Sequence, residues 1–165
     1  MTFHLWSIGH AARHSSHLMV WRLLAFEDLH VHELYEVLRL RSEVFVVEQQ
    51  CIFHDMDGTD PQAKHLLGVR DGVLLAYARC FKAGVKFPEA SFGRALVRQS
   101  ARGTGLGHAL VEQTVIAISQ LWGPQPIRIG AQLQLAAFYA QHGFEKTGKP
   151  YMEDGIEHLE MLRPA

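Results

Sequence analysis

Cysteine, surplus charge and long apolar runs are all scarce in this chain. The two cysteines, Cys51 and Cys80, are too few for a disulfide scaffold, and they lack the C-x-x-C spacing of a zinc site or redox pair. Basic residues number 16 and acidic residues 17, and this balance disfavours nucleic acid or an anionic membrane as a partner. No apolar run reaches membrane-spanning length, and no secretory signal stands out. We therefore expect a cytoplasmic protein.

The length of 165 residues is enough for one domain with a sizeable core. Hydrophobic residues make up 48% of the chain and charged residues 20%, as in ordinary globular proteins. Residues 1–17 hold several histidines among small and polar residues, without sustained periodicity and without the spacing of a regular metal site. We expect a poorly ordered leader over 1–17 and a single domain over 18–165.

Hydrophobic patterning predicts a mixed α/β layer architecture without internal repeats. Strands are expected over 18–26, 64–70, 73–81, 91–97, 127–131, 144–147 and 156–162, and helices over 32–40, 102–121 and 133–142. Residues 41–50 are expected to continue the helix directly or after a bend, despite three valines, and 51–62 to form a loop. Asp71-Gly72 is typical of a type I′ hairpin turn, whereas 150–155 is rich in turn residues.

The most informative segment is the glycine-rich turn Arg102–Gly107, between a predicted strand and a long helix. Glycines let the backbone approach a ligand, and amides at a helix N-terminus bind phosphate oxygens. A P-loop would need Lys and a hydroxyl residue where this chain has His108 and Ala109, and the alternating glycines do not match a dinucleotide fingerprint. The leading hypothesis is another phosphate-bearing ligand. The alternative is a turn that merely packs tightly.

Several motifs together resemble the GCN5-related N-acetyltransferase (GNAT) family. Arg102–Gly107 is similar to its acetyl-CoA pyrophosphate loop, R/Q-x-x-G-x-G/A, and Tyr139 before Gly143-Phe144 is similar to its fourth-helix signature. From about Val20 onward the chain resembles the ElaA-type branch. The motifs that carry this resemblance are Leu40-Arg41, Val44–Gln49, Asp55–Asp60 with His65, Ala76–Arg79, Gly93-Arg94, Gly130–Gln132, and Tyr151 with Glu153–Ile156 and His158.

This resemblance implies a central, mostly antiparallel sheet that splays at an acetyl-CoA site, with helices on both faces. It implies transfer of an acetyl group to a primary amine of a small molecule or peptide by direct attack in a ternary complex. Backbone groups near Leu96 and Val97 would hold the acetyl carbonyl and pantetheine arm. Tyr139 would protonate the leaving thiolate. The pyrophosphate would lie on Arg102, Gly103, Thr104, Gly105, Leu106 and Gly107.

An amine with a pKa of about 10.4 must lose a proton before it attacks a thioester, so a general base is needed. The chain offers seven candidates for this role, any of which could instead cap a turn or form a surface pair. They are Glu48, Asp55, Asp57, His65, Glu153, Asp154 and His158. We rank Glu48 and His65 slightly ahead of the others.

Two arginines, Arg79 and Arg94, are candidates for substrate binding. Each lies in the middle of a predicted central strand, where a buried guanidinium requires a carboxylate partner. A substrate could supply that carboxylate, which favours carboxylate-bearing amines as acceptors. If Asp55, Asp57 or Glu153 supplies it instead, the arginines are structural.

No metal is expected in this protein. Asp55, Asp57 and Gly58 superficially resemble a calcium loop, but the glycine comes too early and Leu66 stands where the bidentate glutamate belongs. Acetyl-CoA is the expected cosubstrate. A non-catalytic acyl-CoA-binding sensor, a longer acyl donor and a homodimer remain open alternatives.

Overall fold

The computed structural model describes residues 18–165, and the leader expected over Met1–His17 lies outside this range. The strands are β1 (Val20–Ala25), β2 (Lys64–Arg70), β3 (Val73–Phe81), β4 (Ala90–Val97), β5 (Ile127–Gln132), β6 (Glu145–Glu153) and β7 (Ile156–Arg163). The main helices are α1 (Val31–Arg41), α2 (Leu106–Trp122) and α3 (Ala136–Ala140). Short helical segments are η1 (Phe26–Asp28), η2 (Ser42–Glu48), η3 (Asp60–Gln62), η4 (Gln99–Ala101) and η5 (Leu133–Leu135).

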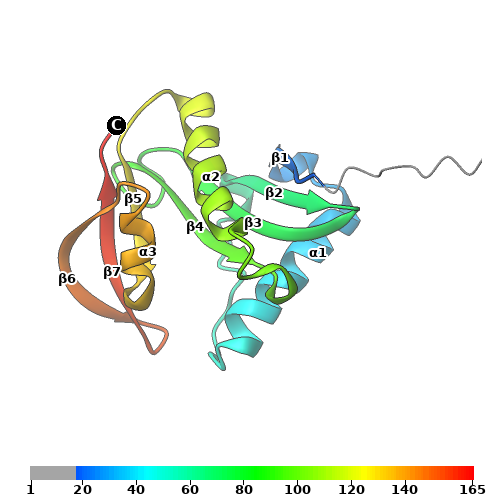
Figure 1. The fold of residues 1–165 in the computed structure, drawn as a ribbon, viewed down its shortest axis with the longest axis horizontal. Coiled ribbons are helices and arrows are strands. Elements are labelled where there is room, and N and C mark those ends of the chain that lie inside the picture. The colour runs from blue at the N-terminus through cyan, green and yellow to red at the C-terminus, as the bar shows by residue number, and fades with distance from the viewer. Residues whose placement is uncertain (1–17) are drawn as a thin grey trace, which may run out of the picture.

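All seven strands form one sheet in the order β1-β2-β3-β4-β5-β7-β6 (Figure 1). Every neighbouring pair is antiparallel except β4 and β5, which are parallel. The Asp71-Gly72 turn joins β2 to β3, and its positive φ angles of 51° and 78° are those a type I′ turn requires. The predicted mixed α/β, mostly antiparallel fold is confirmed.

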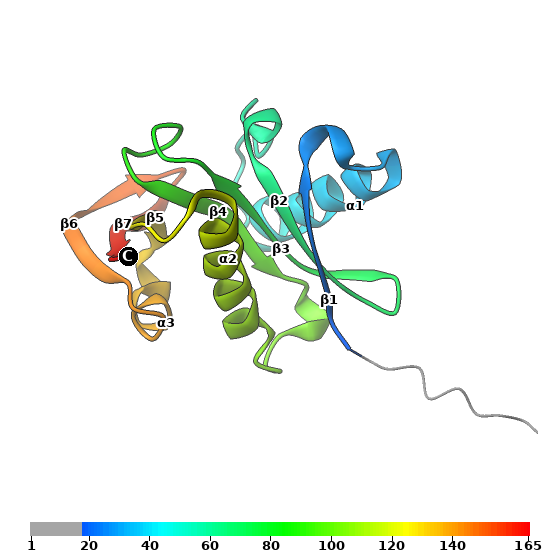
Figure 2. The ribbon, with the colours of Figure 1, turned by 90° about the horizontal axis from the view of Figure 1, so that it is seen from above.

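The helices cover both faces of the sheet (Figure 2). On one face, α1 and η2 bury Val37, Leu40 and Val44 against residues of β2, β3 and β4. On the other face, α2 packs Leu106 and Leu110 on β2 and β3 and joins α3 in the core over β5 and β7. Each helix thus buries an apolar stripe on the sheet.

The sheet opens between β4 and β5. These strands pair only at Ala90↔Ile127 and Ser91↔Arg128, close to the start of each strand. Arg94 has a φ of 49°, in the left-handed region, and the β3–β4 register shifts beside it, which marks a bulge in β4. Beyond Ser91, therefore, the edge of β4 that faces β5 has no strand partner.

One element takes an unexpected form, and two differ from the sequence-based expectation. Residues 42–48 continue α1 as a π-helical segment, a form of the helical continuation that we expected. The long helix begins at Leu106, after the glycine turn rather than at Arg102. The prediction of a turn over 150–155 is wrong for 150–153, because β6 runs to Glu153 and the turn contains only Asp154-Gly155. Pro150 is tolerated in β6 because this strand lies at the sheet edge, where a missing N–H breaks no central ladder.

Candidate functional site

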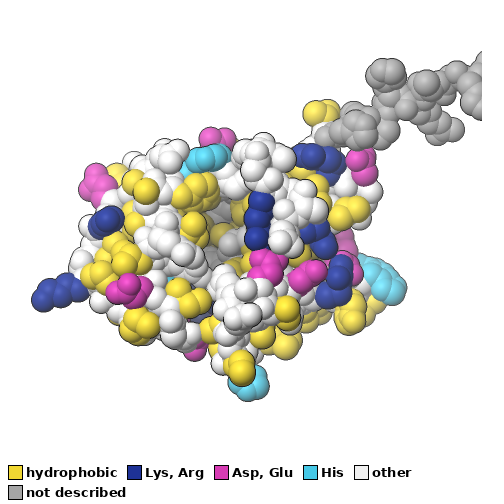
Figure 3. Space-filling model, turned by 60° about the horizontal axis from the view of Figure 1, so that its bottom comes forward, with side chains coloured by type: hydrophobic (Ala, Val, Ile, Leu, Met, Phe, Trp, Pro, Cys, Tyr) yellow, Lys and Arg dark blue, Asp and Glu magenta, His cyan; other side chains and the backbone are white. Residues whose placement is uncertain are grey.

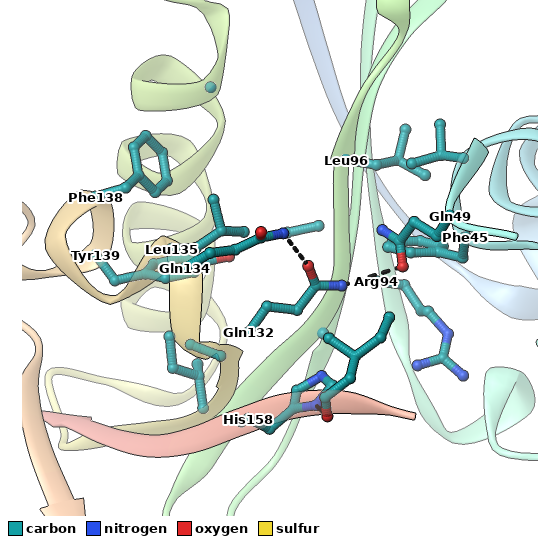
Figure 4. Close-up of a pocket in the computed structure, with 18 of the residues that line it drawn as sticks. Phe45, Gln49, Arg94, Leu96, Gln132, Gln134, Leu135, Phe138, Tyr139 and His158 are labelled. Carbon is teal, nitrogen blue, oxygen red and sulfur yellow. Dashed lines mark hydrogen bonds between the residues drawn. The ribbon is translucent and has the colours of Figure 1, made fainter. Parts of the chain in front are cut away.

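A cavity of about 530 Å³ lies in the opening between β4 and β5. We call its side formed by α2 and α3 the helix wall, and its side formed by residues 45–53, Arg94 and the β6–β7 turn the loop wall. Figure 3 shows a hollow near the middle of one face, bordered by hydrophobic and by charged side chains. Figure 4 shows side chains entering the cavity from both halves of the splayed sheet. A ligand here would touch both halves.

The glycine turn forms an open cradle beside the helix wall. Gly103 and Gly105 have φ angles of 74° and 82°, and an added Cβ at either would meet no atom within 4 Å. Gly105 precedes α2 without any side-chain cap, so the first amides of this 17-residue helix face outward. Free amides and the positive helix end favour phosphate oxygens. The observed turn therefore fits a pyrophosphate.

Arg102 joins this turn to β4 and η2. Its Nε donates to the Val97 carbonyl at 2.9 Å, and its Nη2 donates to Glu48 Oε2 at 2.8 Å. Both side chains line the cavity. The Arg102 guanidinium therefore lies at the rim of the cavity and forms an ion pair with the Glu48 carboxylate.

Leu96 and Val97 lie on the part of β4 that pairs with β3 but not with β5, and both line the cavity. The Arg98 amide donates to the Leu75 carbonyl of β3 at 2.8 Å. Consecutive amides of a strand point to opposite edges, so the Val97 amide faces the opening. This is the arrangement an acyl carbonyl would need for a main-chain donor.

Tyr139 of α3 is buried in the helix wall, among the rings of Phe92, Phe138 and Phe144. It lines the cavity, and its hydroxyl makes no hydrogen bond within residues 18–165. Burial raises the pKa of Tyr139 to about 12. The phenol is therefore fully protonated at neutral pH and can donate a proton into the cavity.

His65, one of the two favoured bases, does not line the cavity. It is completely buried beneath η3, and both ring nitrogens are engaged: Nε2 donates to the Asp60 carbonyl at 3.0 Å and Nδ1 accepts from the Tyr77 hydroxyl at 2.7 Å. Burial lowers the pKa of His65, and the hydrogen bond to Asp60 opposes this shift only in part. His65 is a structural histidine, and the expectation of a catalytic role for it is corrected.

His158 of β7 has the geometry that His65 lacks. It lines the cavity, and its Nδ1 donates to the Ile156 carbonyl at 2.9 Å, which leaves Nε2 as an acceptor (Figure 4). Its ring stacks on Tyr151. His158 is one of the seven candidate bases in the sequence. The one sequence feature that indicates where its side chain points is its position next to the apolar Leu159, because neighbouring strand residues face opposite sides of a sheet.

Arg79 is a structural residue and not a substrate ligand. It is buried, donates to Asp57 at 2.5 and 2.8 Å and to Asp60 at 3.0 Å, and does not line the cavity. Sequence reasoning missed its neighbour Arg41, which is completely buried and binds Asp55 and Asp60 at 2.8 and 2.6 Å. Burial alone would raise the pKa of Asp60, but the hydrogen bond and charge of Arg41 hold it below its ordinary value.

Arg94 is the one predicted substrate ligand that lines the cavity. Its Nε donates to Asp55 Oδ1 at 2.7 Å, so the protein supplies a carboxylate here as well. The acidic loop 55–60 is thus held to β3, β4 and the end of α1 by arginines. Within residues 18–165 no group of three or more His, Cys, Asp or Glu residues is placed to hold a metal ion.

Side chains also join the two halves where the strands part. Gln132 of β5 donates to Gln49 at 3.2 Å and accepts from Gln134 at 3.0 Å (Figure 4). In the loop wall, the Cys51 thiol donates to the Asp154 carbonyl at 2.9 Å. These contacts link the end of η2 to β5 and to the β6–β7 turn.

Comparison with known proteins agrees with this architecture. The family model described as an acetyltransferase (GNAT) domain matches residues 30–163, and the chain belongs to this family. It is of the ElaA type: it is 37% identical to Protein ElaA of Escherichia coli over 148 residues, which are 88% of this chain and 97% of that protein. A UPF0039 protein of Synechocystis is 41% identical over 143 residues, 86% of this chain and 93% of the other.

Solved structures give the same result. A crystal structure of an acyl-CoA N-acyltransferase from Pseudomonas aeruginosa matches with a TM-score of 0.84 at 40% identity, over 88% of this chain and 99% of that chain. The crystal structure of Escherichia coli ElaA matches with a TM-score of 0.82 at 36% identity and equal coverage. The chain therefore has an acyltransferase fold of a family that uses acyl-CoA. None of the helices in residues 18–165 has the length and apolar character needed to cross a membrane.

Proposed function

We propose that this protein is an acetyl-CoA-dependent N-acetyltransferase that acts on a primary amine. The observation that carries the proposal is the unpaired edge of β4, which faces a cavity beside the open amides of α2. In this proposal, the glycine turn Arg102–Gly107 holds the pyrophosphate of acetyl-CoA, and the β4 edge at Leu96 and Val97 holds the acetyl and pantetheine groups. We also propose that the reaction takes place in the cytoplasm, as the low cysteine content favours.

The reaction needs one proton acceptor and one proton donor. We assign the first role to His158, whose Nε2 takes a proton from the acceptor ammonium and leaves a neutral amine. The amine nitrogen then bonds to the acetyl carbon and the carbon–sulfur bond breaks. Tyr139 gives its proton to the leaving thiolate and regains one from the newly bonded nitrogen, which leaves a neutral amide. Glu48 remains the second candidate base, although its carboxylate is bound to Arg102.

Calorimetric titration with acetyl-CoA tests the cofactor site. Gly105→Glu places a negative side chain at the cradle and should abolish binding by repelling the pyrophosphate. Gly84→Glu is the matched control, because Gly84 also has a positive φ and open space around its Cβ position but lies between β3 and β4. Wild type and Gly84→Glu should bind equally. Absence of binding to wild type would refute the assignment.

Amine-dependent release of free thiol separates an enzyme from an acyl-CoA sensor. Wild type incubated with acetyl-CoA and a panel of primary amines should release thiol in step with the amine concentration. Tight acetyl-CoA binding with no release for any amine would instead favour the non-catalytic module. Tyr139, free of hydrogen bonds within the described chain and directed into the cavity, supports the enzyme.

A further inference from the structure

Arg94 is held at an unusual point of the backbone. It has a left-handed φ of 49°, which non-glycine residues rarely adopt, within the bulge of β4. This conformation places its side chain in the loop wall of the cavity. An arginine that keeps such a position needs surrounding contacts to maintain it.

Those contacts fix the guanidinium and leave one edge open. Nε and Nη2 donate to the side chain and carbonyl of Asp55 at 2.7 and 3.3 Å, and the rings of Phe45 and Phe53 lie 5.7 and 5.3 Å from Cζ. Nη1 makes no hydrogen bond within residues 18–165 and is not sealed from solvent. The group is thus preorganised, with a free donor at the cavity.

The charge on Arg94 is only partly compensated. Asp55 shares its single carboxylate between two arginines, because Oδ2 accepts from Arg41 and Oδ1 from Arg94. The loop wall elsewhere carries Glu153 and Asp154 at the β6–β7 turn, close to His158. The part of the loop wall at Arg94 therefore favours an anion, and the part at the β6–β7 turn favours a cationic amine. Figure 4 shows Arg94 on β4, near Phe45, and His158 on β7, in the other half of the splayed sheet.

We propose that the acceptor is a short aminocarboxylate, with its carboxylate on Nη1 of Arg94 and its amine between His158 and the β4 edge at Leu96. This inference rests on the proposed function. Arg94 and Leu96 are two residues apart on β4 and line the same cavity, so the proposal requires an amine and a carboxylate only a few bonds apart. Free amino acids meet this requirement, whereas the C-terminal carboxylate of a long peptide does not.

The test compares the common free amino acids with their own carboxamides as acceptors, by thiol release from acetyl-CoA. Each pair offers the same side chain and a primary amine, and the two are compared above the pKa of both amines, where the carboxylate is the remaining difference. Wild type should prefer at least one amino acid over its amide by roughly 10- to 100-fold in kcat/KM, the range of a charge-assisted hydrogen bond. Arg94→Gln should lower kcat/KM for that amino acid and bring the ratio toward one, and Arg94→Lys should retain part of it. Arg39→Gln, on the exposed face of α1, is the control and should keep the ratio.

A ratio near one in wild type would overturn the proposal, as would an unchanged ratio in Arg94→Gln. Turnover of amides alone would overturn it while the acetyltransferase assignment stands. Calorimetric titration of wild type with the free amino acids needs no acetyl-CoA. It therefore tests the acceptor site at Arg94 separately from the proposed acetyl-CoA site. Heat of binding that Arg94→Gln abolishes supports the acceptor site even if acetyl-CoA fails to bind. No binding and no turnover of any amino acid overturns it.

Discussion

The Nδ1 atom of His158 lies 2.9 Å from the main-chain carbonyl oxygen of Ile156. A carbonyl can only accept, so Nδ1 carries the proton and Nε2 holds the free lone pair. His158 also faces Gln132 across the β5–β7 ladder, which places it at the end of the strand that borders the opening. The backbone thus sets the tautomer of a histidine in the cavity.

Replacement of His158 by Gln should slow acetyl transfer. Glutamine keeps a polar side chain of similar size but accepts no proton, so kcat/KM at neutral pH should fall by roughly 10²–10⁴-fold. The loss should shrink as pH rises toward the pKa of the amine, because the amine then deprotonates without help. Steady-state thiol release between pH 7 and 10 measures both effects.

The control for this variant is His32→Gln, an exposed position on α1. It should behave as wild type throughout the pH range. Glu48→Gln is the competing variant. If it lowers the rate in the same pH-dependent way while His158→Gln retains full activity, the base is Glu48.

Tyr139→Phe should lower kcat by roughly 10²-fold while acetyl-CoA still binds, since only the proton donor is removed. Burial raises the pKa of Tyr139 to about 12, so the phenol stays protonated through pH 10. In wild type, the rate should therefore rise with pH to a plateau, with no alkaline decline up to pH 10. A decline centred near pH 9 would show that another group donates the proton.

The elements that local chemistry specifies could be predicted from the sequence. The Asp71-Gly72 hairpin depends on two residues that tolerate positive φ, and the glycine turn before α2 depends on Gly103 and Gly105. The extent of β6 could not be predicted from the sequence. Pro150 is incompatible with a central strand but not with an edge strand, and only the order of strands in the complete sheet shows that β6 lies at the edge.

Residues far apart in the sequence decide the rest of the site. His65 satisfies both ring nitrogens with Tyr77 and the Asp60 carbonyl, a pairing that no spacing rule reveals. The same holds for the arginines, because the sequence shows that Arg79 and Arg94 need partners but not which carboxylate reaches each one. The structure gives Arg79 two aspartates and leaves Arg94 with an open donor.

Asp60→Asn should destabilise the fold strongly. Its carboxylate accepts from both Arg41 and Arg79, and its loss leaves two buried guanidinium groups short of charge, at a cost of about 3–5 kcal/mol. Urea denaturation followed by circular dichroism measures the free energy of unfolding. Glu36→Gln, which breaks an exposed pair with Arg39, is the control and should leave that free energy nearly unchanged. Equal effects from both variants would contradict a structural role for the acidic loop.

The buried thiol of Cys80 should make stability fall in alkaline solution. Burial raises the pKa of Cys80 from its ordinary value of 9.0 to about 12. Above pH 9 the thiol therefore ionises in the unfolded chain but not in the folded one, so proton release favours unfolding. The contribution of the protonated Cys80 thiol to the free energy of unfolding is fully present below pH 9. It is lost between pH 9 and pH 12, at up to about 1.4 kcal/mol per pH unit. Urea denaturation between pH 8 and 10.5 under reducing conditions should show a steeper decline for wild type than for Cys80→Ala, because alanine has no proton to lose. Parallel declines for the two proteins would mean that the Cys80 thiol does not titrate differently in the folded and unfolded states.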